Sequence, residues 1–431
     1  VLLLVPFLGL SQSKRKIRIE AEKQKATLIS NLKSHIGYLA SDALEGRRTG
    51  TAGADAAMDY LVKQYQQLGI GPKGTSGYLQ KFEINEGLQL DPSTYFTVNN
   101  IQLKIEKDFF PLANSASISI TGKPAMALNE KGQPWFKDIK ETLEENKSNP
   151  HFDVEAWIKK EVTAAAAKGA TAFMIFNTGS IVDNILFNKN DKTEAFSIPV
   201  IYITQAGFQY FTDPSATLQL ELGVRIVEKK RPATNVAAYI NNGATNTVVI
   251  GAHYDHLGRM GRKTYFPGGN DNASGVGMLL SVAKKLKRTP LEKYNVLCIA
   301  FAGEEIGLVG SQAFLESPLL DRSKVSMVLN MDIMGSGEEG ITVVNGSVYT
   351  GLFDRLVKIN QTYGLLKAIK PRGKAANSDH FVFSNAGIPA LFIYTMGENK
   401  NYHDVKDTYD ALSFSAFNAL ETLVLTFLKS F

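Results

Sequence analysis

The chain has 431 residues, of which 44% are hydrophobic and 21% charged, with 36 Gly and 15 Pro. This composition excludes a disordered or fibrous protein and is typical of a globular one with two or three domains of about 150 residues each. The 47 basic and 42 acidic side chains leave a net charge of only +5, and the basic clusters are short. The sequence therefore does not indicate a nucleic-acid partner, and it carries no signal for oligomeric state.

The first ten residues are apolar apart from Gly9 and include Pro6. This run is too short for a membrane span, which needs about 20 residues, but it fits the hydrophobic part of a signal peptide. We therefore predict that residues 1–12 are a signal peptide remnant and that the protein is exported, to the periplasm or the extracellular medium. The alternative is a buried N-terminal strand.

Helical periodicity covers residues 18–44 and 54–68, with a turn-rich loop between them, and residues 79–101 alternate like strands. We assign residues 13–109 to the N-terminal part of the main domain. Residues 111–150 are polar and weakly periodic, and they are followed by a helix with an Ala run and by apolar strands at 172–176 and 198–203. These features predict a small inserted α/β domain over residues 110–227.

From residue 235 onward, short apolar runs alternate with amphipathic helices, which assigns residues 228–431 to the main domain. The predicted strands are 236–240, 247–252, 295–302, 326–331 and 388–394, and the predicted helices are 274–286, 309–316, 351–363 and 413–428. This alternation predicts an α/β fold with a mostly parallel mixed sheet sandwiched by helices. In such sheets the chemistry lies at the carboxyl ends of the strands.

Cys298 is the only cysteine in the sequence, which excludes an intrachain disulfide and a thiolate metal site. It lies in the apolar run 296–302, so we interpret it as a small buried side chain rather than a nucleophile. Any metal ion must therefore be held by His, Asp and Glu side chains.

Charged and imidazole side chains follow the apolar strands at one predicted sheet edge. These residues are His253, Asp255, Glu304, Glu305 and Asp332, to which a Gly-rich turn adds Asp271 and the segment after the last strand adds His403. Each alone has an ordinary explanation as a helix cap, a turn residue or a solvated helix start. Together at one edge they would repel one another unless cations neutralised them.

Oxygen and imidazole ligands without thiolate suit zinc, manganese or cobalt in an open hydrolytic site. Two histidines and three carboxylates exceed the needs of one tetrahedral ion and match a pair of ions that share a bridging carboxylate and activate a bridging water. Asp255 follows His253 by two residues and can orient its ring. Of the adjacent Glu304 and Glu305, one can bind metal while the other takes a proton from water.

The motifs around these residues resemble those of the co-catalytic zinc exopeptidase family, which includes bacterial aminopeptidases, aminopeptidase Y, glutamate carboxypeptidase and glutaminyl cyclase. The resemblance covers residues 235–408 and extends to residues 39–50. The motifs are Gly251-Ala-His-Tyr-Asp-His-Leu-Gly, Asn270-Asp-Asn-Ala-Ser-Gly, Phe301-Ala-Gly-Glu-Glu, Asn330-Met-Asp, Tyr402-His403 and Leu39-Ala-Ser-Asp-Ala-Leu-Glu-Gly-Arg-Arg-Thr-Gly.

The resemblance implies two Zn²⁺ ions as cofactors. By position, His253 and Asp332 would bind one zinc, Glu305 and His403 would bind the other, and Asp271 would bridge them. It further implies a cis peptide bond between Asp271 and the next residue.

The same resemblance implies that Asp255 orients a ligand and that Glu304 is the general base. It makes Tyr402 a candidate for steadying the oxyanion, with a packed aromatic ring as the alternative. His380 is a candidate substrate contact or support for a ligand, with a packed structural histidine as the alternative. We interpret His256 as a residue that shapes its loop rather than as a ligand.

These roles imply a metal-dependent aminopeptidase that hydrolyses the N-terminal bond of peptides with a free amino terminus through a zinc-bridging hydroxide. The insert resembles a protease-associated domain, mainly through Ala164-Ala-Ala-Ala-Lys-Gly-Ala and Ser197-Ile-Pro-Val. The alternatives are a single-zinc enzyme like glutaminyl cyclase, a carboxypeptidase, and a non-catalytic receptor-like relative.

Overall fold

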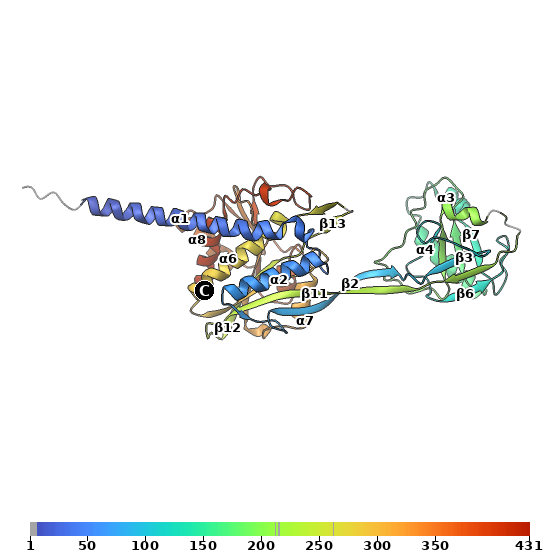
Figure 1. The fold of residues 1–431 in the computed structure, drawn as a ribbon, viewed down its shortest axis with the longest axis horizontal. Helices are drawn as coiled ribbons and strands as arrows, with labels where there is room; N and C mark the ends of the chain where they lie inside the picture. Colours follow the sequence, from blue (N-terminus) through green and yellow to red (C-terminus); the bar gives the residue numbers. More distant parts are fainter. Residues whose placement is uncertain (1–6, 212, 214–215, 262) are drawn as a thin grey trace, which may run out of the picture. The chain divides into compact units, whose positions relative to one another are not determined.

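The computed structural model describes residues 7–211, 213, 216–261 and 263–431. The described chain divides into two compact units, one formed by the residues up to Ile84 together with Pro232–Phe431, and the other by Asn85–Arg231. The chain leaves the first unit in β2 (Leu79–Leu90) and returns to it in β11 (Ile226–Ile240), and these two strands pair with each other (Figure 1). Of the predicted signal peptide remnant, residues 1–6 lie outside the described residues, and the remainder begins the first helix.

Nine strands of the described chain form the sheet of the first unit, in the order β1-β11-β15-β12-β16-β19-β17-β18, with β2 also pairing with β11. The four central strands, from β15 to β19, are parallel, whereas β11 pairs antiparallel with β15 and β17 antiparallel with β19. The fold class predicted from the sequence is thus confirmed. The remaining bounds are β1 Gly71–Pro72, β12 Asn246–His253, β15 Tyr294–Phe301, β16 Val325–Met331, β17 Gly340–Val344, β18 Ile369–Pro371 and β19 Ala390–Met396.

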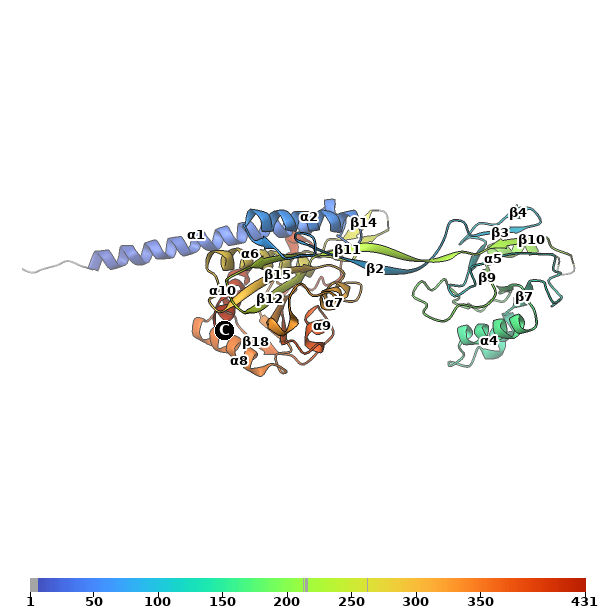
Figure 2. The same cartoon turned by 90° about the horizontal axis from the view of Figure 1, so that it is seen from below.

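Helices cover both faces of this sheet, which is why its central strands are nearly continuous apolar runs. One face packs against α1 (Phe7–Leu39), α2 (Ala52–Gln67), α6 (Gly275–Arg288), α8 (Thr350–Tyr363) and α10 (Phe417–Lys429). The other face packs against α7 (Val309–Glu316) and α9 (His380–Asn385) through Phe314 and Phe383. Figure 2 shows α1 and α2 on one side of the sheet and α9 on the other. A small hairpin, β13 (Gly258–Met260) with β14 (Thr264–Phe266), lies outside the sheet.

Helix α1 owes its place to a stripe of apolar side chains at helical spacing, in which Leu32, Ile36 and Leu39 are fully buried. The helix ends at Leu39 rather than continuing to Leu44 as predicted, because the chain then turns sharply. Three successive residues, Glu45, Gly46 and Arg47, have positive φ values of 46°, 73° and 37°. At Gly46 a Cβ would lie only 2.5 Å from the carbonyl oxygen of Phe266, so a side chain has no room there. No helix in the described part of the chain is both long and apolar enough to cross a membrane.

The second unit contains two four-stranded sheets, β4-β3-β10-β6 and β5-β9-β8-β7, within the described residues. They enclose an apolar core that includes Phe96, Phe136 and Phe211, and α3 and α4 cover the outer face of β8 and β9. The bounds are β3 Tyr95–Val98, β4 Ile101–Gln102, β5 Phe109–Pro111, β6 Ser119–Gly122, β7 Trp135–Asp138, α3 Lys140–Asn146, α4 Val154–Ala167, β8 Phe173–Phe176, β9 Val200–Ile203, α5 Gln205–Phe208 and β10 Leu220–Gly223.

The start of this second unit differs from the boundary predicted at residue 110. The unit begins at Asn85, because β3 and β6 both pair with β10, and residues 85–109 therefore fold with the insert. These pairings join segments about a hundred residues or more apart in sequence, so neither the local composition nor the periodicity could show them. The end of the unit, at Arg231, lies close to the predicted residue 227.

Candidate metal centre

Three neighbouring parallel strands end at the candidate site. Strand β12 ends at His253, β15 leads through a short turn to Glu304 and Glu305, and β16 is followed at once by Asp332. Because β15, β12 and β16 are adjacent and parallel, their carboxyl ends lie at one edge of the sheet. The apolar strands thus fix the positions of the charged side chains that follow them.

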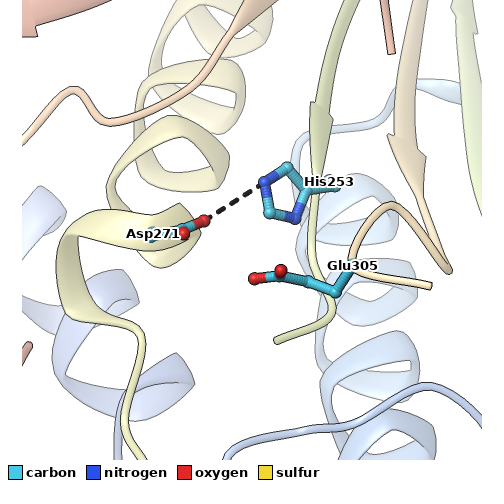
Figure 3. A group of neighbouring side chains, drawn as sticks. All are labelled: His253, Asp271 and Glu305. Atoms are coloured by element: carbon cyan, nitrogen blue, oxygen red, sulfur yellow. Dashed lines mark ion pairs between the residues drawn. The ribbon is translucent and has the colours of Figure 1, made fainter. Parts of the chain in front are cut away.

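Two further side chains come from outside the strands. Asp271 lies in the turn Gly269–Ser274 that leads into α6, and the peptide bond between Asp271 and Asn272 is cis, as the resemblance implied. His403 lies in the loop after β19 and has a φ of 53°. Figure 3 shows the side chains of His253, Asp271 and Glu305 converging from the strand end, the turn and the loop.

The structure brings all five predicted metal ligands together, with Asp271 in the middle. Its Oδ1 lies 3.3 Å from Nε2 of His253, and its Oδ2 lies 3.2 Å from Nε2 of His403. Nε2 of His253 is also 3.3 Å from Oδ2 of Asp332, and Nε2 of His403 is 3.1 Å from Oε2 of Glu305. The Asp271 carboxylate is therefore shared between two histidine–carboxylate pairs.

The pKa shifts in the cluster show that its carboxylates strongly favour positively charged groups beside them. Burial opposes protonation of His253, but Asp332 and Glu304 outweigh burial and raise the pKa of this ring well above its usual value. Hydrogen bonds with Asp271 and Glu305 raise the pKa of His403 to about 10. Burial alone would raise the pKa of Asp271, but its hydrogen bonds with the two histidines lower it well below its ordinary value.

Glu304 is largely buried beside these ligands. Burial raises its pKa to about 9, with the carboxylates of Asp379 and Asp332 adding to the effect and His253 opposing it. One of its carboxylate oxygens lies within 4.8 Å of a ligand atom of His253 and of one of Asp332. These three residues could therefore hold a metal ion together. A cation placed there would lower the pKa of Glu304 by favouring its charged form.

The residues fit a pair of divalent cations better than they fit an empty polar cluster. Four largely buried carboxylates, those of Asp271, Glu304, Glu305 and Asp332, face three imidazoles, so like charges remain packed together unless cations separate them. Among the residues that the structure describes, Oδ1 of Asp332 is buried without a hydrogen-bond partner, which leaves it available as a ligand atom. Oxygen and imidazole donors of this kind suit zinc.

Asp255 is fully buried behind His253, where it was expected to orient the ring. Nδ1 of His253 lies 3.3 Å from the backbone carbonyl of Asp255 and 3.7 Å from its Oδ1. The carboxylate itself is fixed, because Oδ2 accepts a 2.7 Å hydrogen bond from the Thr49 hydroxyl and Oδ1 accepts one of 3.2 Å from the Glu304 backbone N–H. Asp255 therefore directs Nε2 of His253 toward the cluster.

The remaining candidates lie in different surroundings. The Tyr402 ring is exposed and stacks on His403 with 3.9 Å between ring centroids. His380 is fully buried and packs against Phe392, which favours its alternative interpretation as a structural histidine. His256 is more closely involved than the sequence indicated, because its Nδ1 lies 2.6 Å from Oε1 of Glu305.

Sequence reasoning missed several polar residues that hold the ligands. Asp407 accepts hydrogen bonds of 2.9 Å from the backbone N–H groups of both Asn270 and Asp271. The Ser378 hydroxyl donates to Oδ2 of Asp332 at 3.1 Å. Asp407 follows His403 by four residues in a polar segment, which is only a weak indication in the sequence that it supports a ligand. Nothing in the sequence indicates this role for Ser378.

Comparison with known proteins finds a peptidase family and several aminopeptidases among the similar sequences. The sequence model of the family described as Peptidase family M28 matches residues 235–428. The chain is 29% identical over 291 residues to the probable lipoprotein aminopeptidase LpqL of Mycobacterium tuberculosis, covering 59% of this chain and 55% of that protein. It is 28% identical over 267 residues to aminopeptidase YwaD of Bacillus subtilis, covering 58% and 54%. The chain thus spans about half the length of these curated relatives.

Among solved structures, BSAP, a zinc aminopeptidase from Bacillus subtilis, superimposes with a TM-score of 0.52 at 19% identity, over 93% of this chain and 94% of that one. At this identity the likeness concerns the fold. Together with the five convergent side chains, the match over residues 235–428 and these relatives support the resemblance of the chain to peptidase family M28 and to the co-catalytic zinc exopeptidases.

Proposed function

We propose that this protein is a di-zinc aminopeptidase that removes residues from the free amino end of peptides. The observation that carries the proposal is the shared carboxylate of Asp271, with one oxygen facing His253 and the other facing His403. A single ion would not require a carboxylate placed between two separate histidine–carboxylate pairs. The similarity to two aminopeptidases and to a zinc aminopeptidase supports the substrate class and the metal.

In this proposal His253 and Asp332 would hold one zinc ion, His403 and Glu305 would hold the other, and Asp271 would contact both. When bound, the ions would polarise the substrate carbonyl and make a water molecule acidic enough to act as a nucleophile near neutral pH. The chain's own residues supply the remaining steps of the reaction.

Glu304 takes the proton from the attacking water and passes it to the leaving amine, as a general base and then a general acid. Asp255 keeps the His253 ring oriented throughout. Partial shielding of its hydroxyl from water and the nearby carboxylates raise the pKa of Tyr402, so the hydroxyl stays protonated and can donate a hydrogen bond to the developing oxyanion.

A panel of aminoacyl chromogenic substrates, each with a free or a blocked amino group, tests the activity. We expect hydrolysis only of the unblocked substrates, its loss after chelation, and its return with zinc. Cleavage of blocked substrates would contradict an aminopeptidase. Cyclisation of an N-terminal Gln substrate by protein holding one zinc would instead identify the glutaminyl cyclase alternative, and zinc binding without any turnover would identify a receptor-like relative.

The substitution Glu304→Gln tests the role of the general base. We expect both zinc ions to remain bound while kcat falls by about 10²–10⁴, the usual contribution of general acid–base catalysis. Glu316→Gln, on the exposed end of α7, is the matched control and should leave kcat unchanged. Near-normal turnover by Glu304→Gln would refute the assignment.

We further propose that the unit Asn85–Arg231 is the protease-associated-like insert and that the protein is exported. The first proposal is supported by the resemblance of its Ala-rich helix and Ser197-Ile-Pro-Val segment, and the second by the apolar start of the sequence and by the word lipoprotein in the name of one relative.

A further inference from the structure

Arg47 is a fully buried arginine that lies outside the segment matched by the family. A guanidinium has five N–H donors, and each of the five in Arg47 is matched by a backbone carbonyl oxygen. The acceptors are Tyr254 from Nε at 2.7 Å, Leu39 and Pro267 from Nη1, and Gly268 and Asp271 from Nη2 at 2.7 and 3.4 Å. Burying a guanidinium is costly unless its donors are satisfied, and here they are.

Four of the five acceptors lie in or beside the two loops that carry central ligands, and the fifth, Leu39, ends α1. Tyr254 directly follows His253. The carbonyl of Asp271 belongs to the turn Gly269–Ser274, and those of Pro267 and Gly268 belong to the two residues just before it. One planar side chain therefore ties the end of β12 to the turn before α6.

The segment around Arg47 strengthens this connection. The backbone carbonyl of Arg47 accepts a 3.3 Å hydrogen bond from the N–H of His256, whose ring contacts Glu305. Two residues later, the Thr49 hydroxyl fixes Asp255. The turn at Glu45–Arg47, with its positive φ values, is what directs these groups toward the site.

The positive charge of Arg47 also suits its position near the carboxylates of the cluster. Burial lowers its pKa, while the carboxylates of Asp271, Asp407 and Asp255 act in the opposite direction. An arginine remains protonated in proteins, so Arg47 is a permanent positive charge behind the acidic cluster.

We propose that Arg47 is a positioning residue of the metal centre, which sets the separation of His253 and Asp271 by fixing the backbone of both their loops. The inference rests on the proposed function, because it assumes that these residues bind zinc. A segment some two hundred residues before His253 and Asp271 would thereby influence zinc affinity directly.

Zinc affinity, measured by competition with a chromogenic chelator at a temperature well below unfolding, tests the proposal. Arg47→Lys keeps the positive charge but has three donors in place of a planar fork of five. We expect its affinity for zinc to fall about 10–100-fold, the range found when groups that orient metal ligands are removed. Arg47→Ala should lose at least as much affinity and regain part of it when millimolar guanidinium is added.

The matched control is Arg259→Ala, which removes an exposed arginine that pairs with Glu45 near the same turn. Its zinc affinity should equal that of the wild type, with or without guanidinium. A folded Arg47→Lys that binds two zinc ions with wild-type affinity would overturn the proposal, and this variant decides the matter if Arg47→Ala does not fold. Wild-type protein that fails to bind zinc would instead refute the proposed function.

Discussion

The two histidine–carboxylate pairs of the metal centre have the same chemistry but different settings. The His253 side chain is 1% exposed and stands at the end of a strand that is paired on both sides. The His403 side chain is 37% exposed and stands in a loop. The carboxylates that complete the pairs, Asp332 and Glu305, are both nearly buried. The pairs therefore differ in the rigidity and accessibility of their histidines.

This difference leads us to expect distinct roles for the two proposed metal positions. Preorganised ligands lose little conformational entropy when they bind an ion, so the pair built on His253 should bind zinc more tightly. An exposed ligand on a loop leaves its ion open to solvent and to substrate. If the proposed function holds, a peptide would approach from the open pair, and the buried pair would anchor the centre.

The largest effect should come from the residue that both pairs share. Asp271→Ala removes a ligand from each metal position, and the repulsion among the remaining carboxylates then has less compensation. We expect zinc content to fall from two ions toward none and hydrolysis to fall to background, as measured by metal analysis and the chromogenic assay. Asp354→Ala on the exposed face of α8 is the control. Retention of two tightly bound zinc ions by Asp271→Ala would contradict the bridging role.

Replacing the two histidines separately tests the difference between the pairs. His253→Ala opens a cavity at a fully buried site and should cost about 2–5 kcal/mol of unfolding free energy in zinc-free protein, by analogy with other large-to-small core substitutions. His403→Ala removes a partly exposed side chain and should change that free energy little. Both variants should hold fewer than two zinc ions. Equal destabilisation in urea titrations would mean that the two settings do not differ as described.

Stepwise removal of zinc from the wild-type protein gives a smaller, kinetic effect. A chelator should remove one ion quickly, from the exposed His403 side, and the other more slowly, from the buried His253 side. His403→Ala should then show only the slow phase. A single phase of release in the wild type, with both ions leaving together, would argue that the shared Asp271 couples the pairs too strongly for them to differ.

The sequence predicted the position of those candidate ligands that follow directly from the strands. His253, Glu305 and Asp332 each come after an apolar run, so the parallel sheet itself places them at one edge. The meeting of Asp271 with His403 could not be derived from periodicity, because both residues lie in irregular segments. Their pairing was anticipated only through resemblance to a family.

The residues that position the candidate ligands were harder to predict from the sequence than the candidate ligands themselves. Arg47 sits in a turn rich in polar residues and Gly, where an arginine is normally exposed to solvent. Its acceptors are backbone carbonyls, which carry no side-chain signal, and most of them lie about two hundred residues away in the sequence. The same difficulty hid the pairing of β3 with β10 and so displaced the predicted start of the second unit. Long-range contacts made by backbone groups leave no local pattern.

The smallest predicted effect concerns protein stability at acidic pH and lies outside the proposed metal centre. It must be separated from the effect of metal loss when the two histidine–carboxylate pairs are compared at acidic pH. Nδ1 of His35 on α1 is 2.7 Å from the Tyr60 hydroxyl on α2. Burial, and secondarily Lys284, lowers the pKa of His35 to about 4, whereas the pKa of Tyr60 is raised to about 12. The hydroxyl thus donates to a neutral imidazole, and protonation of His35 would remove that acceptor.

The sign of the pH effect follows from these values. The unfolded chain binds a proton at His35 near pH 6.5 and the folded chain only near pH 4, so this residue's stabilising contribution is complete above pH 6.5 and is lost as the pH falls toward 4. We expect the loss to amount to about 1–3 kcal/mol of unfolding free energy. In urea titrations of zinc-free protein, His35→Gln, which keeps an acceptor for Tyr60, should lose less stability over this interval than the wild type. His151→Gln, at an exposed site in the other unit, should follow the wild type. Parallel pH profiles for His35→Gln and the wild type would show that the acid sensitivity arises from the carboxylate cluster instead.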